Sequence, residues 1–184
     1  AEPLGHGQYA SVFLAAPRTR GQMYTLADSS VHQIPATVAV KTIDKARVFR
    51  MSDLQREIDV MRMISSHSNV VRLFETFDEP KKLHLVMEPC FGGTLFDRVV
   101  EHGKFTATLT AETMCALCAA LAHLHSKNIV HRDLKPENVL YTSRAPDAVL
   151  KLADFGTAVV LGQHSTGTSP GTPMYAAPEA LRNE

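Results

Sequence analysis

The chain has 184 residues, carries 19 basic and 19 acidic side chains, and has a formal net charge of zero. A chain of this length can bury one core as a single folding unit, and its balanced charge, without a basic stripe, argues against nucleic acid as a partner. No apolar run is long enough to predict a membrane span, no signal peptide is visible, and three cysteines are too few for a disulfide scaffold.

The first motif is a pair of glycines near the N-terminus. Residues 4–12 read Leu-Gly-His-Gly-Gln-Tyr-Ala-Ser-Val, and Gly5 and Gly7 allow the backbone to lie close against a phosphate. Taken alone, this motif is better explained as a plain β-hairpin turn. Residues 38–41 then read Val-Ala-Val-Lys, and this alternation predicts a strand with Lys41 on the face opposite the valines.

An amphipathic helix is expected next. Ser52 and Gln55 form a capping-box pattern at its start. Apolar residues recur at helical spacing and define its buried face, namely Leu54, Ile58 and Met61. Glu57 lies beside that face, and by itself it would be an ordinary solvated acid of a helix.

Two longer elements follow: residues 83–90 predict a strand that runs into a linker, and residues 108–126 predict a long apolar helix. One face of this helix carries Met114, Leu117, Cys118, Leu121 and Leu124. Cys115 and Cys118 spell Cys-x-x-Cys, but without a second pair they fit core packing better than a redox or zinc site. Three histidines gather nearby without the spacing of zinc ligands, namely His123, His125 and His131.

The most informative stretch is residues 131–138, which read His-Arg-Asp-Leu-Lys-Pro-Glu-Asn. Twenty-one residues after its aspartate, Asp133, the triplet Asp-Phe-Gly begins at Asp154. This run and triplet together resemble the catalytic loop and the metal-binding loop of protein kinases. The reaction that this resemblance implies, phosphoryl transfer, needs a carboxylate that orients the attacking hydroxyl and oxygen ligands for Mg²⁺. Asp133 suits the first role, and Asn138 with Asp154 suits the second.

With Gly-Thr-Pro-Met-Tyr-Ala-Ala-Pro-Glu at residues 171–179, these motifs resemble the serine/threonine protein kinases, in order and over nearly the whole chain. Residues 91–97 are similar to the segment after the hinge in the calmodulin-dependent and calcium-dependent protein kinases. The resemblance implies an α+β fold with a β-rich small lobe and a mainly helical large lobe. The large lobe would be incomplete, because a whole kinase domain continues with several more helices.

The resemblance also implies how the chain is divided. The small lobe, the hinge and the partial large lobe would be residues 1–87, 88–93 and 94–184. The large lobe would hold the catalytic loop at 131–138 and the activation segment at 154–179. The small lobe would carry an insertion at about 18–35, which is rich in polar and turn-forming residues and is expected to be mobile.

In kinases of this kind, ATP and Mg²⁺ bind between the lobes, and the γ-phosphate passes to a serine or threonine of a protein substrate. The resemblance makes Asp133 the residue that orients the acceptor hydroxyl. Lys41 and Lys135 would balance phosphate charge, and Glu57 would pair with Lys41. The nucleotide pocket would be lined by Leu4, Gly5, Gly7, Val12, Ala39, Lys41, Met87, Glu88, Cys90, Leu140 and Asp154.

Control of activity is expected at the activation segment. Arg132 precedes the catalytic aspartate, and in kinases an arginine here pairs with a phosphate on that segment. Thr168 best matches the position of the phosphate, which an upstream kinase would add, although residues 163–170 equally fit a flexible polar loop. Thr172 is expected to bond the catalytic aspartate and lysine as a structural residue.

Three residues bear on substrates and ligands. Glu137 is placed to attract a basic residue of a peptide. Thr94 stands where relatives usually carry a glutamate, which weakens the expectation of an arginine three residues before the acceptor. Cys90, at the hinge, is expected to be accessible to covalent ligands beside the nucleotide.

A second hypothesis is a truncated or pseudokinase-like module that binds nucleotide or a partner protein without turnover. The presence of all the motif residues argues against it, and the missing later helices argue for it. Control by calcium is suggested only by the resemblance, since no EF-hand loop lies in these residues. An intracellular location, cytoplasmic or nuclear, is expected.

Overall fold

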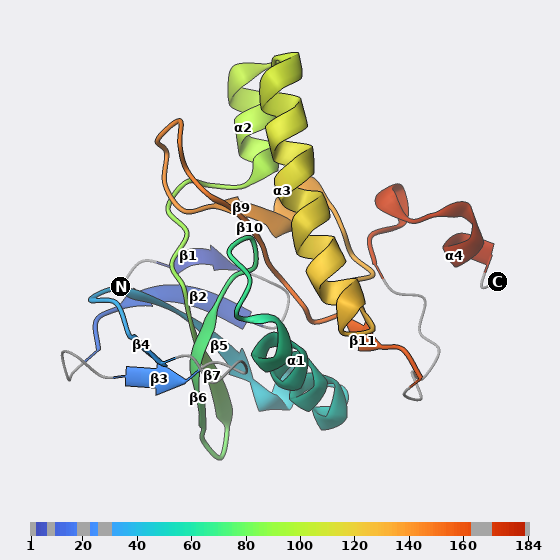
Figure 1. Cartoon of the computed structure of the whole chain (residues 1–184). Helices are drawn as coiled ribbons and strands as arrows, with labels where there is room; N and C mark the ends of the chain where they lie inside the picture. Colours follow the sequence, from blue (N-terminus) through green and yellow to red (C-terminus); the bar gives the residue numbers. More distant parts are fainter. Residues whose placement is uncertain (1–2, 7–9, 18–22, 26–30, 163–170, 183–184) are drawn as a thin grey trace.

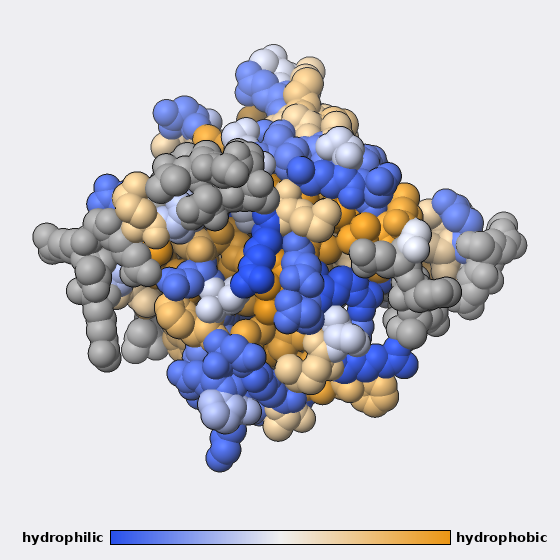
Figure 2. Space-filling view, turned by 60° about the horizontal axis from the view of Figure 1, so that its bottom comes forward, coloured by the Kyte–Doolittle hydropathy of each residue, from blue (hydrophilic) through white to orange (hydrophobic). Residues whose placement is uncertain are grey.

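The computed structural model describes residues 3–6, 10–17, 23–25, 31–162 and 171–182. Figure 1 shows a β-rich part, built mostly from the first half of the chain, next to a part dominated by two helices, α2 (Leu95–His102) and α3 (Ala107–Ser126). The predicted α+β architecture with two lobes is therefore confirmed. Hydrophilic and hydrophobic residues are interspersed over the face turned forward in Figure 2, in keeping with the balanced composition.

The small lobe is built on a five-stranded antiparallel sheet. Its strands lie in the order β1 (Pro3–His6), β2 (Ala10–Ala15), β5 (Val38–Asp44), β7 (Lys82–Met87) and β6 (Leu73–Asp78). The strand predicted at residues 38–41 is the middle strand, β5. Successive side chains of a strand point to opposite faces, so Ile43 joins the main core while Val38 joins a second cluster on the other face.

Part of the predicted insertion is folded. β3 (Met23–Thr25) and β4 (Val31–Gln33) pair antiparallel as a small separate sheet. Tyr24 and Ile34 are buried in the second cluster. The expectation of mobility also covered residues 18–22 and 26–30, which lie outside the described residues.

One helix, α1 (Met51–Ile64), packs against the sheet. Its predicted apolar face is buried, as are further residues of the helix, which together are Leu54, Glu57, Ile58, Val60, Met61 and Ile64. The predicted capping box is wrong. The N-cap residue is Arg50, which makes no side-chain cap hydrogen bond, and Ser52 already lies inside the first turn. A short 3₁₀ turn, Lys45–Arg47, precedes the helix.

The two longer helices described in the large lobe, α2 and α3, begin at threonine caps. Thr94 forms a capping box with Asp97 at the start of α2, and Thr106 accepts a hydrogen bond from the Leu109 amide at the start of α3. These caps satisfy amide groups that the first turn of a helix leaves unpaired. Thr94, at the position where the resemblance implies a glutamate, thus has a structural role in this chain as the cap of α2.

The buried face of α3 differs from the predicted one. Its buried residues are Thr113, Leu117, Ala120 and Leu124. Met114 is half exposed, and Cys115 and Cys118 are both exposed, so the prediction that the two cysteines serve core packing is wrong. α3 is apolar around most of its circumference, and such a helix does not reveal from its pattern which side is covered.

Among the described residues, α3 is also the one helix long and apolar enough to cross a membrane by length and composition. No such run was expected from the sequence. This finding is weak evidence for a span, because the core helix of a soluble protein passes the same test. Here α3 packs against two short strands, β8 (Ile129–Val130) and β10 (Leu150–Leu152).

The remaining elements of the large lobe are short. β9 (Val139–Tyr141) pairs with β10, and β11 (Val159–Val160) pairs with β8. The other pieces are 3₁₀ turns at Pro136–Asn138 and Pro173–Tyr175 and a helix, α4 (Pro178–Arg182). The main core runs through both lobes without a break, from Ile58 and Leu85 to Leu124 and Phe155.

A pair of histidines joins the lobes and predicts acid sensitivity. His67, in the segment after α1, stacks on His123 of α3 with ring centroids 4.9 Å apart. Burial lowers the pKa of both rings. Lys151 lowers the pKa of His67 further, and His67 and Lys127 lower that of His123. The two histidines therefore bind protons more readily in the unfolded chain than in the folded one. Their contribution to the free energy of unfolding should be complete above about pH 6.5 and should be lost as the pH falls through their lowered pKa values.

Thermal unfolding at pH 7.5 and at pH 5.5 checks this expectation. His123→Gln should lose less stability between the two conditions than the unsubstituted protein. His125→Gln, an exposed residue of the same helix, should lose as much as the unsubstituted protein. The same pH profile in all three proteins would contradict the assignment of acid sensitivity to the stacked pair.

Candidate active site

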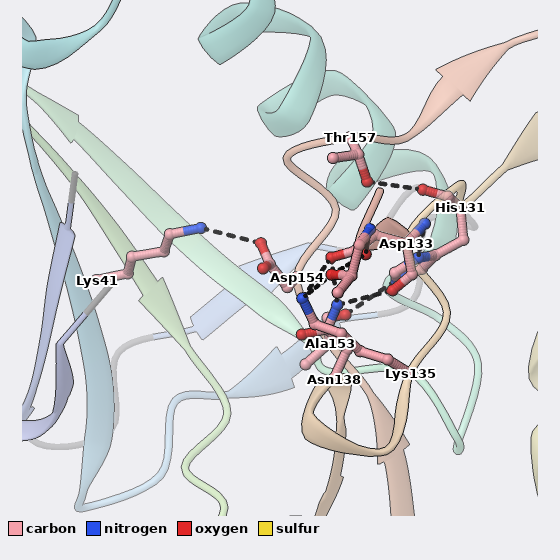
Figure 3. Close-up of polar contacts among 9 residues, drawn as sticks. Lys41, His131, Asp133, Lys135, Asn138, Ala153, Asp154 and Thr157 are labelled. Atoms are coloured by element: carbon pink, nitrogen blue, oxygen red, sulfur yellow. Dashed lines mark hydrogen bonds and ion pairs between the residues drawn. The ribbon is translucent and has the colours of Figure 1, made fainter. Parts of the chain in front are cut away.

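The loop between β8 and β9 brings the sequence-predicted polar residues together. Asp133 Oδ2 lies 2.8 Å from Lys135 Nζ and accepts a hydrogen bond from Asn138 Nδ2 at 3.1 Å. Asp133 Oδ1 accepts from the backbone amide and the hydroxyl of Thr172, each at 2.8 Å. Figure 3 shows this cluster, with Asp133, Lys135 and Asn138 converging. The aspartate is therefore held in one orientation by groups from the loop and from the activation segment.

Thr172 occupies the place expected of it. Its hydroxyl accepts a hydrogen bond from Lys135 at 2.7 Å while donating to Asp133. Its neighbour Gly171 has φ of +98°, and a Cβ there would lie 2.5 Å from the carbonyl oxygen of Arg132. A glycine at this position is needed both for the left-handed backbone and for the close approach of the segment to the loop.

The charges of Asp133 and Lys135 stabilise each other. Burial opposes ionisation of Asp133, but hydrogen bonds from Lys135 and Thr172 outweigh it and lower the pKa of the carboxyl. The hydrogen bond to Asp133 raises the pKa of Lys135 against the effect of its burial. Both groups are therefore charged over the whole neutral range of pH.

The predicted ion pair between β5 and α1 is present. Lys41 Nζ lies 2.6 Å from Glu57 Oε1, and Glu57 is only 7% exposed. Lys41 Nζ also lies 3.6 Å from Asp154 Oδ1 in the large lobe, and Figure 3 shows the two side chains pointing toward each other. Burial lowers the pKa of Lys41, but the attraction of Glu57 and Asp154 exceeds that effect and leaves the pKa raised. One cation is thus shared by carboxylates of both lobes.

The Asp-Phe-Gly triplet is anchored by its phenylalanine. Phe155 is fully buried, and its ring meets that of His131 edge to face at 5.2 Å. His131 Nε2 lies 3.0 Å from the carbonyl oxygen of Ala153. Asp154 and Arg132 both have φ above +60°, a conformation that costs free energy in residues other than glycine and that clusters at functional sites.

Asn138 and Asp154 are suitable ligands for Mg²⁺. The Nδ2 group of Asn138 donates to the carbonyl and the carboxylate of Asp133, so the side-chain oxygen is the atom that could bind a metal. Asp154 presents a half-exposed carboxylate. Magnesium prefers oxygen ligands and is held by few protein groups together with substrate phosphates. Among the described residues no group of three or more histidine, cysteine or carboxylate side chains offers a separate metal site.

The residues expected around a nucleotide come from several elements. Ala39 is 5% exposed and pairs in register with Met87, while Val12 pairs with Lys41. Leu4 and Gly5 lie on β1 and Leu140 on β9, whereas Gly7 lies outside the described residues. The amide of Glu88 donates to the carbonyl oxygen of Arg72 at 2.8 Å, so its own carbonyl is the backbone group left for a ligand.

The structure gives the predicted Arg132 a neighbour, Arg56, that was not predicted from the sequence. Arg132 donates to the Thr157 carbonyl at 2.7 Å. Burial lowers the pKa of Arg132, and the nearby positive charge of Arg56 lowers it further. Arg56, on α1 directly before Glu57, pairs with Asp53. Arg132 thus bonds the activation segment at Thr157, and Arg56 of the small lobe lies near enough to Arg132 to affect its pKa.

A second missed contact also joins the lobes. Lys151 is 5% exposed, and its ammonium lies 2.8 Å from the Glu88 carboxylate at the hinge. The only sequence signal was a lone lysine between two leucines in a short apolar strand, Leu150–Leu152.

Cys90 is a poor nucleophile in this environment. Burial and the charge of Glu88 raise the pKa of its thiol to about 12, against the opposing effect of Lys151. Because the thiolate is the reactive form, iodoacetamide at pH 7.5 should label Cys115 and Cys118 first, with Cys90 slower by about a hundredfold or more. Peptide mass spectrometry over time measures the three rates. If Cys90 were labelled as fast as Cys115 and Cys118, the expectation would be contradicted, and Cys90 would be an accessible target for covalent ligands.

Comparison with known proteins places the chain among kinases. The family model described as "Protein kinase domain" matches residues 1–184. Calcium-dependent protein kinase 5 of Plasmodium berghei is 39% identical over 98% of this chain and 30% of its own length. Calcium/calmodulin-dependent protein kinase type 1 of Caenorhabditis elegans is 38% identical over 98% of this chain and 48% of its own length.

Myosin light chain kinase A of Dictyostelium discoideum is 37% identical over 98% of this chain and 57% of its own length. The chain therefore spans from under a third to just over half of these relatives. The match over the whole chain agrees with the site described above, and the chain belongs to the protein kinase domain family.

Proposed function

We propose that this chain transfers the γ-phosphate of ATP to serine and threonine hydroxyls of protein substrates. The observation that carries the proposal is the cluster of Asp133, Lys135 and Thr172, in which one carboxylate is held by an ammonium and by two donors of the activation segment. An ionised and oriented carboxylate is what an attacking hydroxyl requires. The kinase names of the relatives support the same reaction.

Each polar residue then has a defined task. Asp133 accepts a hydrogen bond from the substrate hydroxyl and aims its oxygen at the phosphate. Lys135 and Lys41 offset negative charge as the phosphoryl group moves. When bound, Mg²⁺ supplies further charge neutralisation, and Asn138 and Asp154 are the residues that would hold it.

The chemistry of the acceptor provides the test. Matched peptides that differ only in a serine, threonine or tyrosine acceptor are incubated with ATP and Mg²⁺, and transferred phosphate is counted. Transfer to serine and threonine is the expected result. Transfer to tyrosine alone would contradict the proposal, and ATP binding without transfer to any peptide would favour the second hypothesis of a non-catalytic binding module.

Activation by phosphorylation at Thr168 is proposed on the same grounds. Thr168 itself lies outside the described residues. Arg132 bonds the activation segment at the Thr157 carbonyl, and Arg56 lies near enough to Arg132 to lower its pKa. Guanidinium groups bind phosphate through charge-assisted pairs. Arg56 would exchange its pairing with Asp53 for one with the phosphate.

Arg56→Gln should therefore reduce the gain in turnover after treatment with an upstream kinase by about tenfold. Arg62→Gln is the matched control, because Arg62 lies on the same helix but bonds Thr76. Turnover before and after phosphorylation is compared in all three proteins. Mass spectrometry of fully active protein that finds no phosphate on residues 163–170 would contradict this mode of control.

A further inference from the structure

The β3–β4 pair covers the outer face of the small-lobe sheet. Tyr24 and Ile34 are 8% and 6% exposed and form a cluster with Val38 and Val86. The Tyr24 ring meets Phe74 of β6 at a centroid distance of 4.8 Å with an angle of 60° between the ring planes. This geometry is a favourable edge-to-face contact, so the ring is anchored and its hydroxyl has a fixed position.

The hydroxyl of Tyr24 is connected to the end of α1 by one arginine. Arg72 Nη1 donates to Tyr24 Oη at 3.2 Å, and Nε of the same side chain donates to the carbonyl oxygen of Ser65 at 3.3 Å. Ser65 is the residue that directly follows α1 and is 1% exposed. Since the guanidinium group is rigid and planar, fixing one nitrogen on the tyrosine also fixes the nitrogen that reaches the helix end.

The same helix end is held from other directions. The Ser65 hydroxyl donates to the carbonyl oxygen of Met61 and accepts from the amide of Leu73 at 3.1 Å. Farther along the segment, the amide of Val71 donates to the carbonyl oxygen of Leu152 at 2.9 Å, on β10 of the large lobe. The end of α1 is therefore a junction between the helix, the sheet and the large lobe, and Arg72 connects the β3–β4 pair to it.

We propose that the β3–β4 pair positions α1 for catalysis through Tyr24 and Arg72, and so helps keep Glu57 against Lys41. This proposal rests on the kinase function proposed above. Tyr24 and Arg72 would be positioning residues, because neither contacts the polar cluster of the active site. The competing explanation is that the pair only covers apolar surface, in which case the hydroxyl of Tyr24 has no influence on α1.

Two conservative variants separate these explanations. Tyr24→Phe keeps the ring contact with Phe74 and removes the acceptor of Arg72. Ile34→Val weakens packing in the same cluster and leaves Arg72 untouched. Amide hydrogen exchange of the peptide that covers the last turn of α1 is followed by mass spectrometry, together with thermal unfolding and with kcat and KM for ATP.

In Tyr24→Phe, exchange in the last turn of α1 should accelerate by about two- to tenfold, as the loss of one hydrogen bond implies. kcat should fall by a similar factor, while KM for ATP changes less. Ile34→Val should lower thermal stability but leave α1 exchange as in the unsubstituted protein. Unchanged exchange in Tyr24→Phe, or equal acceleration in both variants, would overturn the proposal.

A double variant tests the connection itself. Arg72→Lys keeps the positive charge, but a lysine lacks the planar guanidinium group that bonds Tyr24 Oη and the Ser65 carbonyl oxygen at the same time. If Tyr24 acts through Arg72, adding Tyr24→Phe to Arg72→Lys should not accelerate α1 exchange further, and additive effects would overturn the proposed route. Amide hydrogen exchange can be measured without phosphate transfer. A protein that transfers no phosphate would therefore contradict the kinase proposal, and the exchange of its variants would still test whether Tyr24 and Arg72 position α1.

Discussion

Asp133→Asn is expected to reduce phosphate transfer by about 10²- to 10⁴-fold, which is the usual contribution of a positioned base. Asparagine has nearly the same shape, and its oxygen can still accept both hydrogen bonds from Thr172, whereas its amide nitrogen cannot accept from Lys135 and Asn138 as Oδ2 does. What it lacks is the negative charge that Lys135 stabilises and that the acceptor hydroxyl needs. Affinity for ATP should change little, because Asp133 faces the hydroxyl and not the nucleotide pocket.

Asp147→Asn is the matched control, since this exposed aspartate lies between β9 and β10, away from the cluster. Initial rates with a serine peptide and ATP-dependent thermal stabilisation are measured for both variants. An Asp133→Asn protein with normal turnover would refute the assignment of the catalytic carboxylate. Loss of ATP binding in that variant would instead show that the residue supports the nucleotide site.

Glu57→Gln should lower turnover by about a hundredfold, the effect expected when a catalytic group is misplaced by about 1 Å. The substitution removes the charge that holds Lys41 at 2.6 Å and leaves Asp154, at 3.6 Å, as the remaining carboxylate near the ammonium. Lys41 would then move toward Asp154 in the large lobe, away from the position in which Glu57 holds it. Stopped-time assays at saturating peptide measure the effect on kcat and on KM for ATP.

Asp59→Asn is the control for this prediction, because Asp59 lies on the same helix, is exposed, and accepts a hydrogen bond from Gln55. It should retain full turnover. Normal turnover in Glu57→Gln, or an equal loss in both variants, would show that the buried ion pair does not position Lys41.

The pH dependence of this pair follows from the raised pKa of Lys41. A lysine whose pKa is raised on folding contributes full stability below its ordinary value of about 10.4, and the contribution is lost as the pH rises through the higher folded value. Lys41 should therefore stay charged, and its contribution to stability should stay constant, up to its ordinary pKa.

Most residues of the candidate site could be predicted from local motifs in the sequence. The alternation at residues 38–41 placed Lys41 on a strand, and helical spacing placed Glu57 beside the buried face of α1. Residues 131–138 are contiguous, so Asp133, Lys135 and Asn138 had to lie near one another. These predictions depended on spacing within one element or one loop, where the geometry of the backbone sets the distances.

Contacts between distant segments could not be predicted in this way. Arg56 approaches Arg132, Glu88 pairs with Lys151, and Tyr24 meets Arg72 only because of how the lobes and the β3–β4 pair are packed. No periodicity in a single sequence encodes such pairings. The insertion that seemed only polar and turn-rich contained two residues, Tyr24 and Ile34, that bury themselves on the sheet.

Two predictions, the start of α1 and the buried face of α3, were wrong because the local sequence pattern fits more than one structure. Ser52 and Gln55 had the spacing of a capping box, but the N-cap residue is Arg50, two residues before Ser52. On α3, apolar residues surround the helix, so spacing alone could not show that Leu117 is buried while Cys118 is exposed. Tertiary packing decides both questions.

The most direct test of the account is Mg²⁺-dependent transfer of the γ-phosphate from ATP to a mixture of serine and threonine peptides, with Asp133→Asn beside the unsubstituted protein. Transfer that requires Mg²⁺ and disappears in the variant is the predicted result. Transfer at the same rate in both proteins would contradict the role assigned to Asp133. Absence of transfer in both, with ATP raising the thermal stability of each, would contradict catalysis while leaving a nucleotide site in place.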